Sequence, residues 1–169
     1  MKQQHLSFKQ QQRKGVNIMA TRQEKYPETR TFHYYNANPK NRITTDCVIR
    51  AIATALEQDY NETVMELAMM QCKTGYDMSE NKCIDLYLQS KGWRKFRQPR
   101  KEDRTKYTGK EFCRLLNGDV RMVGKSVIAN IGGHHIVCIK ETDGLHGLFK
   151  VYDIWDSTDG CIGNYWIKG

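Results

Sequence analysis

A cysteine and a histidine stand where nucleophilic catalysis would need them. Cys47 follows residues 44–46 (Thr-Thr-Asp), whose side-chain oxygens can cap a helix start, and precedes an apolar run without Gly or Pro. There the positive end of the helix dipole favours a thiolate and lowers the thiol pKa. His135 follows Gly132-Gly133-His134 and opens an apolar, β-branched run, which predicts an imidazole at the exposed start of a strand.

A carboxylate that could orient this imidazole follows farther along the chain. Asp153 lies within residues 147–155, whose alternation predicts a strand next to that of His135. On neighbouring antiparallel strands the two side chains come within hydrogen-bond reach if they share a face. A thiol hydrolase needs a thiolate, an imidazole and a group that orients the imidazole. The sequence therefore predicts Cys47, His135 and Asp153 as a catalytic triad.

Two of these residues have a second choice nearby. His134 adjoins His135, and because adjacent residues point to opposite faces of a strand, only one of them can serve as the base. Asp156 lies beyond the alternating segment, beside Ser157-Thr158-Asp159-Gly160, and is predicted to belong to a turn. His135 and Asp153 are therefore preferred.

Each residue taken alone also has a purely structural interpretation. A lone cysteine is more often a small buried hydrophobe than a nucleophile, and an aspartate can simply end a strand. Trp155 and Trp166 are expected in the core. It is the combination of residue types, in this chain order and at element boundaries, that favours the triad.

The elements that would position these residues can be read from periodicity and caps. Helices are predicted at 46–58, from a cap at Asn61 to Gly75, from a cap at Ser79 to Gly92, and from Thr108 to Gly118; strands are predicted at 126–131, 135–140, 147–155 and 164–168. Helices first and strands last predict an α+β fold, with a central N-terminal helix packed on a C-terminal antiparallel sheet.

The length of 169 residues predicts a single domain. Residues 1–25 are rich in Gln, Lys and Arg and are expected to be a disordered basic tail, leaving residues 26–169 as the domain. Met19 is a possible true start, since residues 13–15 can be encoded by a purine-rich stretch similar to a bacterial ribosome-binding site. With no apolar run long enough for a membrane span and no signal peptide, the sequence predicts a cytoplasmic protein that does not bind membranes.

Composition excludes several other classes. The six cysteines are scattered singly and no C-x-x-C occurs, which favours reduced thiols over a disulfide framework or a zinc site, so no metal or cofactor is expected. The net charge of +8 invites a nucleic-acid interpretation, but residues 1–18 contribute +4 of it. A second basic cluster, residues 91–106, is expected to be a loop of mixed charge. Neither cluster has the interleaved aromatics of a single-strand binder, so nucleic-acid binding is disfavoured.

The order of these motifs resembles the papain-like cysteine peptidase superfamily, especially its small bacterial and phage members. The likeness lies in a cysteine at a helix start, then Gly-His before two apolar residues, then Asp153-Ile154-Trp155, and it covers residues 36–166. It implies a papain-like fold and amide hydrolysis of a protein or peptide substrate through a thioester. The family's oxyanion donor is commonly a Gln six positions before the cysteine, where this chain has Asn41, whose amide sits on a shorter stem.

Several alternatives stay open at this point. The same triad can serve acyl transfer, deamidation or cell-wall peptide hydrolysis. The departure at Asn41 keeps a non-catalytic binding module with this fold in play, and a basic nucleic-acid-associated protein is the third choice. The sequence gives neither the substrate nor the oligomeric state.

Overall fold

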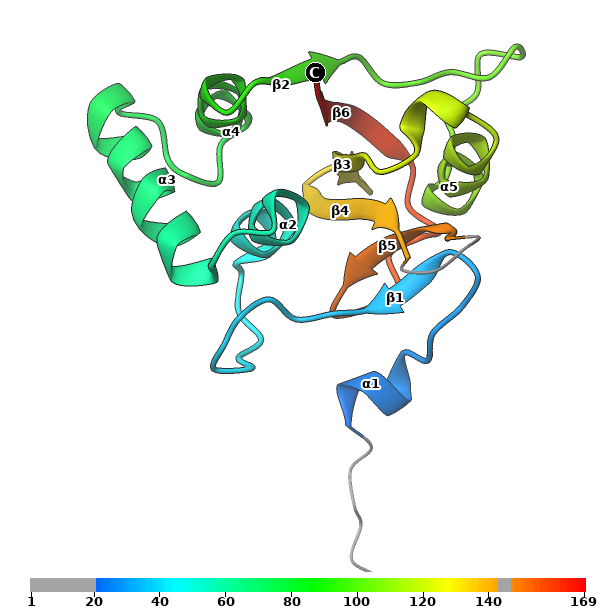
Figure 1. Ribbon diagram of the computed structural model, residues 1–169, viewed down its shortest axis with the longest axis horizontal. Helices are drawn as coiled ribbons and strands as arrows, with labels where there is room; N and C mark the ends of the chain where they lie inside the picture. Colours follow the sequence, from blue (N-terminus) through cyan, green and yellow to red (C-terminus); the bar gives the residue numbers. More distant parts are fainter. Residues whose placement is uncertain (1–20, 143–146) are drawn as a thin grey trace, which may run out of the picture.

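A mixed β-sheet carries helices on both of its faces (Figure 1). The computed structural model describes residues 21–142 and 147–169. The described helices are α1 (Arg22–Lys25), α2 (Cys47–Leu56), α3 (Tyr60–Thr74), α4 (Asn81–Ser90), α5 (Gly109–Asn117) and the 3-10 turn η2 (Val120–Met122). The described strands are β1 (Phe32–Tyr34), β2 (Trp93–Phe96), β3 (Ser126–Ile131), β4 (His135–Glu141), β5 (Phe149–Asp153) and β6 (Ile162–Lys168).

The strands follow the spatial order β1-β5-β4-β3-β6-β2. All neighbouring pairs are antiparallel except β1 and β5, which run parallel with Phe32 opposite Val151. The α+β class is confirmed, but the prediction of a purely antiparallel sheet was wrong. The reason is that β1 reaches β5 through the long connection that contains α2 to α5, and such a crossover permits a parallel pair.

The sheet separates two hydrophobic cores. Ile136 and Cys138 of β4 pack against α2, α3 and α4, whereas Val137 and Ile139 pack on the side of α5. Since both faces of β4 are buried, its sequence is a continuous apolar run rather than an alternating one. This double cover fixes β4 at the centre of the fold, and with it the position of His135 at its first residue.

Helix starts were predicted to within a few residues, and the capping residues differ in two cases. α3 begins at Tyr60 because Asp59, not Asn61, accepts the Glu62 N–H. α4 has Glu80 at its cap position, while the Ser79 hydroxyl bonds to Asp77. Thr108 does cap α5 through a reciprocal pair of bonds with Glu111.

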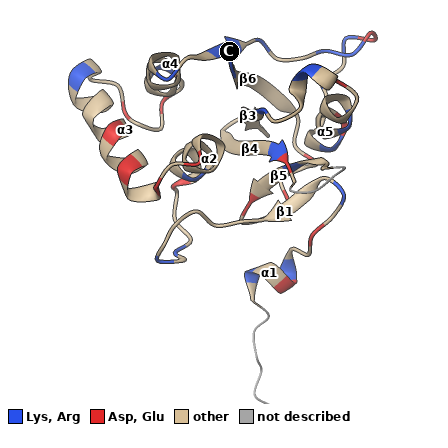
Figure 2. Cartoon of the chain, in the orientation of Figure 1, with Lys and Arg blue, Asp and Glu red and all other residues tan. Residues whose placement is uncertain are grey.

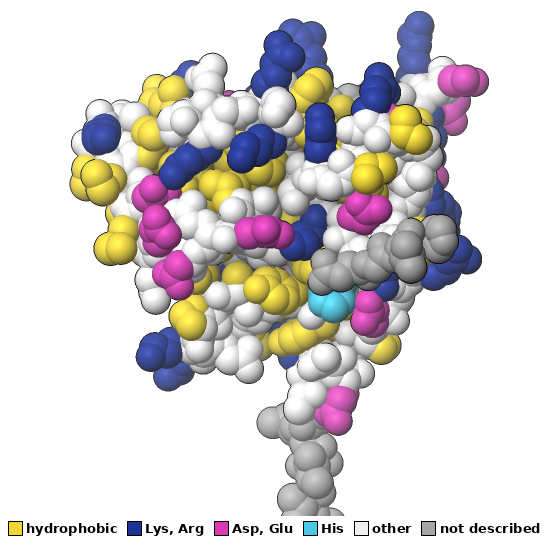
Figure 3. Space-filling model, viewed as in Figure 1, with side chains coloured by type: hydrophobic (Ala, Val, Ile, Leu, Met, Phe, Trp, Pro, Cys, Tyr) yellow, Lys and Arg dark blue, Asp and Glu magenta, His cyan; other side chains and the backbone are white. Residues whose placement is uncertain are grey.

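Four short elements were not anticipated: β1, β2, α1 and the 3-10 turn η2. No strand was predicted at β1, and β2 was expected to be part of a basic loop over residues 91–106, yet β2 forms the sheet edge beside β6. Lys and Arg colour β2 and the segment after it in Figure 2. In Figure 3 basic side chains gather along the upper part of the visible face.

The third unanticipated element, α1, corrects the end of the predicted disordered tail. Residues 22–25 form a helical turn closed by a capping box between Thr21 and Glu24, and Arg22 Nε donates to the Ile154 carbonyl at 2.8 Å. Residues 1–20, with Met19, lie outside the described part of the chain. No helix within the described residues is long and apolar enough to cross a membrane.

Candidate functional site

Cys47 is the first residue of α2, which packs along β4. Val48, Ala51, Ile52 and Ala55 bury the helix against the sheet, so its start is held rigidly at one end of the strands. Cys47 itself is only half-buried. The predicted placement of this thiol in the first turn of the central helix is confirmed.

His135 is placed by a tight turn between β3 and β4. Ile131 ends β3 directly opposite His135, and Gly132 and Gly133 between them have φ values of 62° and 102°. These are left-handed conformations that glycine adopts without the steric cost of a Cβ. The turn thus requires its two glycines, and it places the imidazole at the first residue of β4, beside the start of α2.

Asp153, the last residue of β5, accepts a hydrogen bond from the His135 ring. Nε2 of His135 lies 2.5 Å from Oδ2 of Asp153, as the prediction of a shared strand face requires. Cys138 pairs with Tyr152, so Val137 lies opposite Asp153 and His135 is its diagonal neighbour on the same face. The residue is buried, and its carboxylate also accepts a hydrogen bond from the Ser157 hydroxyl at 3.1 Å. These contacts are those of a carboxylate that orients the imidazole, not of a residue that only ends a strand.

The Cys47 thiol and the His135 imidazole shift each other's pKa in opposite directions. Burial acts to raise the pKa of Cys47, but hydrogen bonding to His135 and to the Ile136 N–H, with the imidazolium charge, leaves that pKa below its ordinary value. Burial acts to lower the pKa of His135, but its hydrogen bonds to Asp153 and Cys47 raise it to about 9. The thiol loses its proton more readily than usual and the imidazole keeps its own longer, which favours a thiolate–imidazolium pair near neutral pH.

Other cysteines show what this environment changes. Cys113 and Cys138 are buried in the core, where burial raises the pKa of each thiol to about 12. Cys72 and Cys161 are exposed and free. Among these thiols, only Cys47 combines partial exposure with a pKa that a neighbouring imidazole lowers.

The sequence analysis did not predict a buried network of charged and polar side chains that adjoins the triad. Asp46 stands at the cap position of α2 but makes no capping bond. Its carboxylate accepts from Arg50, from the Tyr60 hydroxyl at 2.7 Å and from Asn38 Nδ2 at 3.1 Å. The sequence signal was available, because an Asp and an Arg four residues apart face each other on a helix, and Arg50 interrupts an otherwise apolar run.

The remaining predicted residues fall into different places. The Trp155 ring lies 5.2 Å from the His135 ring, so it flanks the site instead of filling the core, whereas Trp166 is buried as expected. Asp156 accepts the backbone N–H and the hydroxyl of Thr158, which confirms its place in a turn. His134 is exposed on the β3–β4 turn.

Asn41 is turned toward its own loop. The residue is exposed with φ 50°, and its Oδ1 accepts Asn36 Nδ2 at 3.1 Å. Its suggested role as an oxyanion donor stays a prediction. The backbone N–H of Cys47, at the free amino end of α2, is a donor that needs no side chain.

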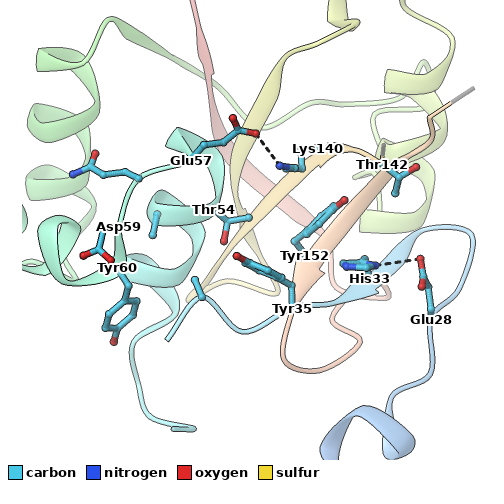
Figure 4. A pocket seen from close by; sticks show the side chains of 13 residues that line it. Glu28, His33, Tyr35, Thr54, Glu57, Asp59, Tyr60, Lys140, Thr142 and Tyr152 are labelled. Atoms are coloured by element: carbon cyan, nitrogen blue, oxygen red, sulfur yellow. Dashed lines mark hydrogen bonds and ion pairs between the residues drawn. The ribbon is translucent and has the colours of Figure 1, made fainter. Parts of the chain in front are cut away.

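A cavity of about 780 Å³ lies elsewhere, beside the far end of α2 (Figure 4). His33, Tyr35 and Tyr152 line it, and the Glu57–Lys140 ion pair stands at its rim. None of the three triad residues belongs to its lining. This cavity is therefore distinct from the site where the reactive groups converge.

Two further findings bound the interpretation. Within residues 21–142 and 147–169, no group of three or more His, Cys, Asp or Glu side chains could hold a metal ion. The chain matches no protein-family model, and no curated protein or solved structure is significantly similar to it.

Proposed function

We propose that this protein is a thiol hydrolase of papain-like architecture that cleaves an amide bond, in a peptide or isopeptide, through a thioester acyl-enzyme. The observation that carries the proposal is the convergence of Cys47, His135 and Asp153: Asp153 holds the imidazole at 2.5 Å, and the thiol and the imidazole shift each other's pKa in opposite directions. Support for the architecture comes from a nucleophile at the start of a helix packed on a sheet whose strands carry the other two residues.

The acylation step follows from the ion pair. The Cys47 thiolate attacks the carbonyl carbon, and the negative charge that develops on the carbonyl oxygen is stabilised by backbone N–H donors at the start of α2. When the tetrahedral intermediate collapses, the C–N bond breaks and the His135 imidazolium gives its proton to the leaving amine. The products of this step are a free amine, a Cys47 thioester and a neutral imidazole.

Deacylation reverses the role of His135. The neutral imidazole takes a proton from water as the water attacks the thioester, and collapse of the second intermediate releases the carboxylic acid and restores the thiolate–imidazolium pair. Asp153 accepts a hydrogen bond from the Nε2–H group throughout both steps, so it keeps the ring oriented with its other nitrogen free to act on the thiol and on water.

The test uses p-nitrophenyl acetate, an activated acyl donor that requires no knowledge of the natural substrate. Wild type is expected to release about one nitrophenolate per chain in a burst and then turn over slowly, the pattern of acyl-enzyme accumulation. Cys47→Ala retains Cys72 and Cys161 as exposed thiols and serves as the control. It is expected to show no burst.

The outcomes separate the competing interpretations. A burst without turnover would point to a module that acylates but does not hydrolyse. The absence of a Cys47-dependent burst would contradict the proposal and favour a non-catalytic binding module. Transfer of the acetyl group to an added amine in preference to water would indicate acyl transfer by the same triad.

A further inference from the structure

The first turn of α2 carries a buried charge to which the proposed reaction assigns no step. The Arg50 side chain is 7% exposed, and its two carboxylate neighbours, Asp46 and Asp153, are 7% and 3% exposed. Removing a charge from water is costly, so an arginine is rarely buried without partners. The partners of Arg50 are found at both ends of the candidate site.

The two arms of the guanidinium reach two different elements. Nη1 donates to Oδ1 of Asp46, the residue that precedes the nucleophile, and Nη2 lies 4.0 Å from Oδ1 of Asp153. The other oxygen of Asp153 bonds to His135. The planar fork of an arginine suits such a double contact, which a lysine ammonium cannot reproduce. Arg50 therefore connects the helix start to the strand end without touching the reacting atoms.

From this geometry we infer that Arg50 is a positioning residue: it holds the start of α2 against the end of β5 and balances the charge of Asp46 beside the Cys47 thiolate. The inference rests on the proposed function, because it assigns Arg50 to the same site. Its charge role follows from Asp46, the residue before Cys47, which is also held by bonds from Tyr60 and Asn38. Without Arg50 its carboxylate would be left unbalanced one residue from the thiol.

Charged and titratable groups reach Arg50 from several elements. Besides Asp46 on its own helix, they are Tyr60 of α3, Asp153 of β5, Tyr34 of β1 and Arg22 of α1. Burial lowers the pKa of Arg50, while Asp153 and the two tyrosines act in the other direction. Since a guanidinium stays protonated across the useful pH range, changes in Cys47 titration on substitution report the balance between Arg50 and Asp46.

The experiment is the pH dependence of Cys47 alkylation by iodoacetamide, followed by mass mapping so that Cys72 and Cys161 are counted separately. Arg50→Met is expected to move the acid limb of the profile upward by about 0.5–1 pH unit, because the unbalanced carboxylate disfavours the thiolate. Asp46→Asn is expected to move it downward, because the guanidinium is then in excess. Arg50→Lys loses the double contact but keeps the charge, and because the limb reports charge it is expected to stay close to wild type.

A purely structural role would not produce shifts of opposite sign. The matched control is Lys91→Met, which breaks the 2.8 Å ion pair with Glu66 away from the site and is expected to leave the profile unchanged. If Arg50→Met and Asp46→Asn shift the limb in the same direction, or not at all, the inference is overturned. If Arg50→Met does not fold by circular dichroism, the Asp46→Asn shift and the Arg50→Lys profile decide by themselves.

Failure of the inference and failure of the proposed function give different results. A wild-type Cys47 that alkylates no faster than Cys72 and Cys161 would contradict the proposed function, whatever the variants do. A fast wild-type Cys47 whose profile is indifferent to Arg50 and Asp46 would leave the hydrolase standing and remove Arg50 from it.

Discussion

The two ends of α2 differ in the burial of their charged side chains. At its start, Asp46, Arg50 and Asp153 are buried together, and Asp46 forgoes the capping bond. At its end, Glu57 adopts a left-handed conformation that closes the helix, and its carboxylate forms an exposed ion pair with Lys140. The C-terminal end of α2 is closed by its own backbone, whereas the N-terminal end lacks a side-chain cap because the Asp46 carboxylate bonds to Arg50 instead.

This difference distinguishes the candidate site from the rest of the helix. Losing a side-chain cap costs a helix about 1 kcal/mol, and buried charges are costly unless paired. Such features persist where the surrounding structure holds them for another purpose. The cavity at the far end of α2 has a volume of about 780 Å³, but its Glu57–Lys140 ion pair is exposed and none of the triad lines it. Convergent buried polar groups mark the site better than volume does.

The largest expected effect is at the start of the helix. Cys47→Ala should abolish the p-nitrophenyl acetate burst, because it removes the thiolate that forms the acyl-enzyme in the proposed reaction. The free energy of unfolding should change by about 1 kcal/mol or less, since Cys47 is half-buried at a helix start. Urea denaturation measures the second quantity. A loss on the scale of a core truncation, about 2–5 kcal/mol, would show that Cys47 is structural.

Substitutions of Asp153 should be graded. Asp153→Asn keeps the shape and one acceptor, so the burst rate should fall only partly; Asp153→Ala frees the imidazole and should be clearly slower. Since Asp153 helps raise the pKa of His135 to about 9, that pKa should fall in both variants, and farther in the Ala form. Titration of His135 by NMR measures it. Equal titrations in wild type and both variants would remove Asp153 from the site and turn attention to Asp156.

A third prediction concerns pH. The pKa of His135 is raised, so the imidazole stays protonated beyond its ordinary range and loses its proton as the pH rises through about 9. Cleavage of an amide needs that proton for the leaving amine, so amide turnover should fall above about pH 9, while alkylation of the Cys47 thiolate should not. A substrate with a good leaving group, such as a nitrophenyl ester, is the control, since its acylation needs no proton. Parallel profiles for amide and ester would contradict the assignment of His135 as the acid.

The smallest effect is expected at the other end of α2. Glu57 has φ 52°, a conformation that glycine adopts at lower cost, and its ion pair with Lys140 is exposed. Glu57→Gly should raise the free energy of unfolding by a few tenths to about 1 kcal/mol and leave the burst unchanged. Urea denaturation checks the first statement. A change in Cys47 reactivity would show that the two ends are coupled.

How far the sequence predicts this structure depends on where each signal lies. Cys47, His135 and Asp153 each stand at an element boundary whose local residues announce it, by helix-capping types, by Gly132-Gly133, or by strand alternation. The pairing of His135 with Asp153 followed from two strands close in the chain. These are short-range patterns, and they predicted the α+β class and the three residues that the structure brings together.

Long-range pairing was harder to foresee. β1 has only three residues and is a strand because β5, far along the chain, supplies its partner. β2 is likewise defined by β6 rather than by its own basic sequence. Arg50 was overlooked because an apolar run was taken as apolar all round, and its second partner, Asp153, becomes a neighbour only in the folded protein.

The central claim, that Cys47 and His135 form an ion pair near neutral pH, is tested most directly by the ultraviolet absorbance of the thiolate near 240 nm. The difference between wild type and Cys47→Ala isolates this one thiol from the other five. The predicted result is about one thiolate per chain at pH 7, lost on acidification well below the ordinary thiol pKa of about 8.5. A difference signal that appears only as the pH approaches 8.5 would contradict the ion pair and, with it, the proposed thiol hydrolase.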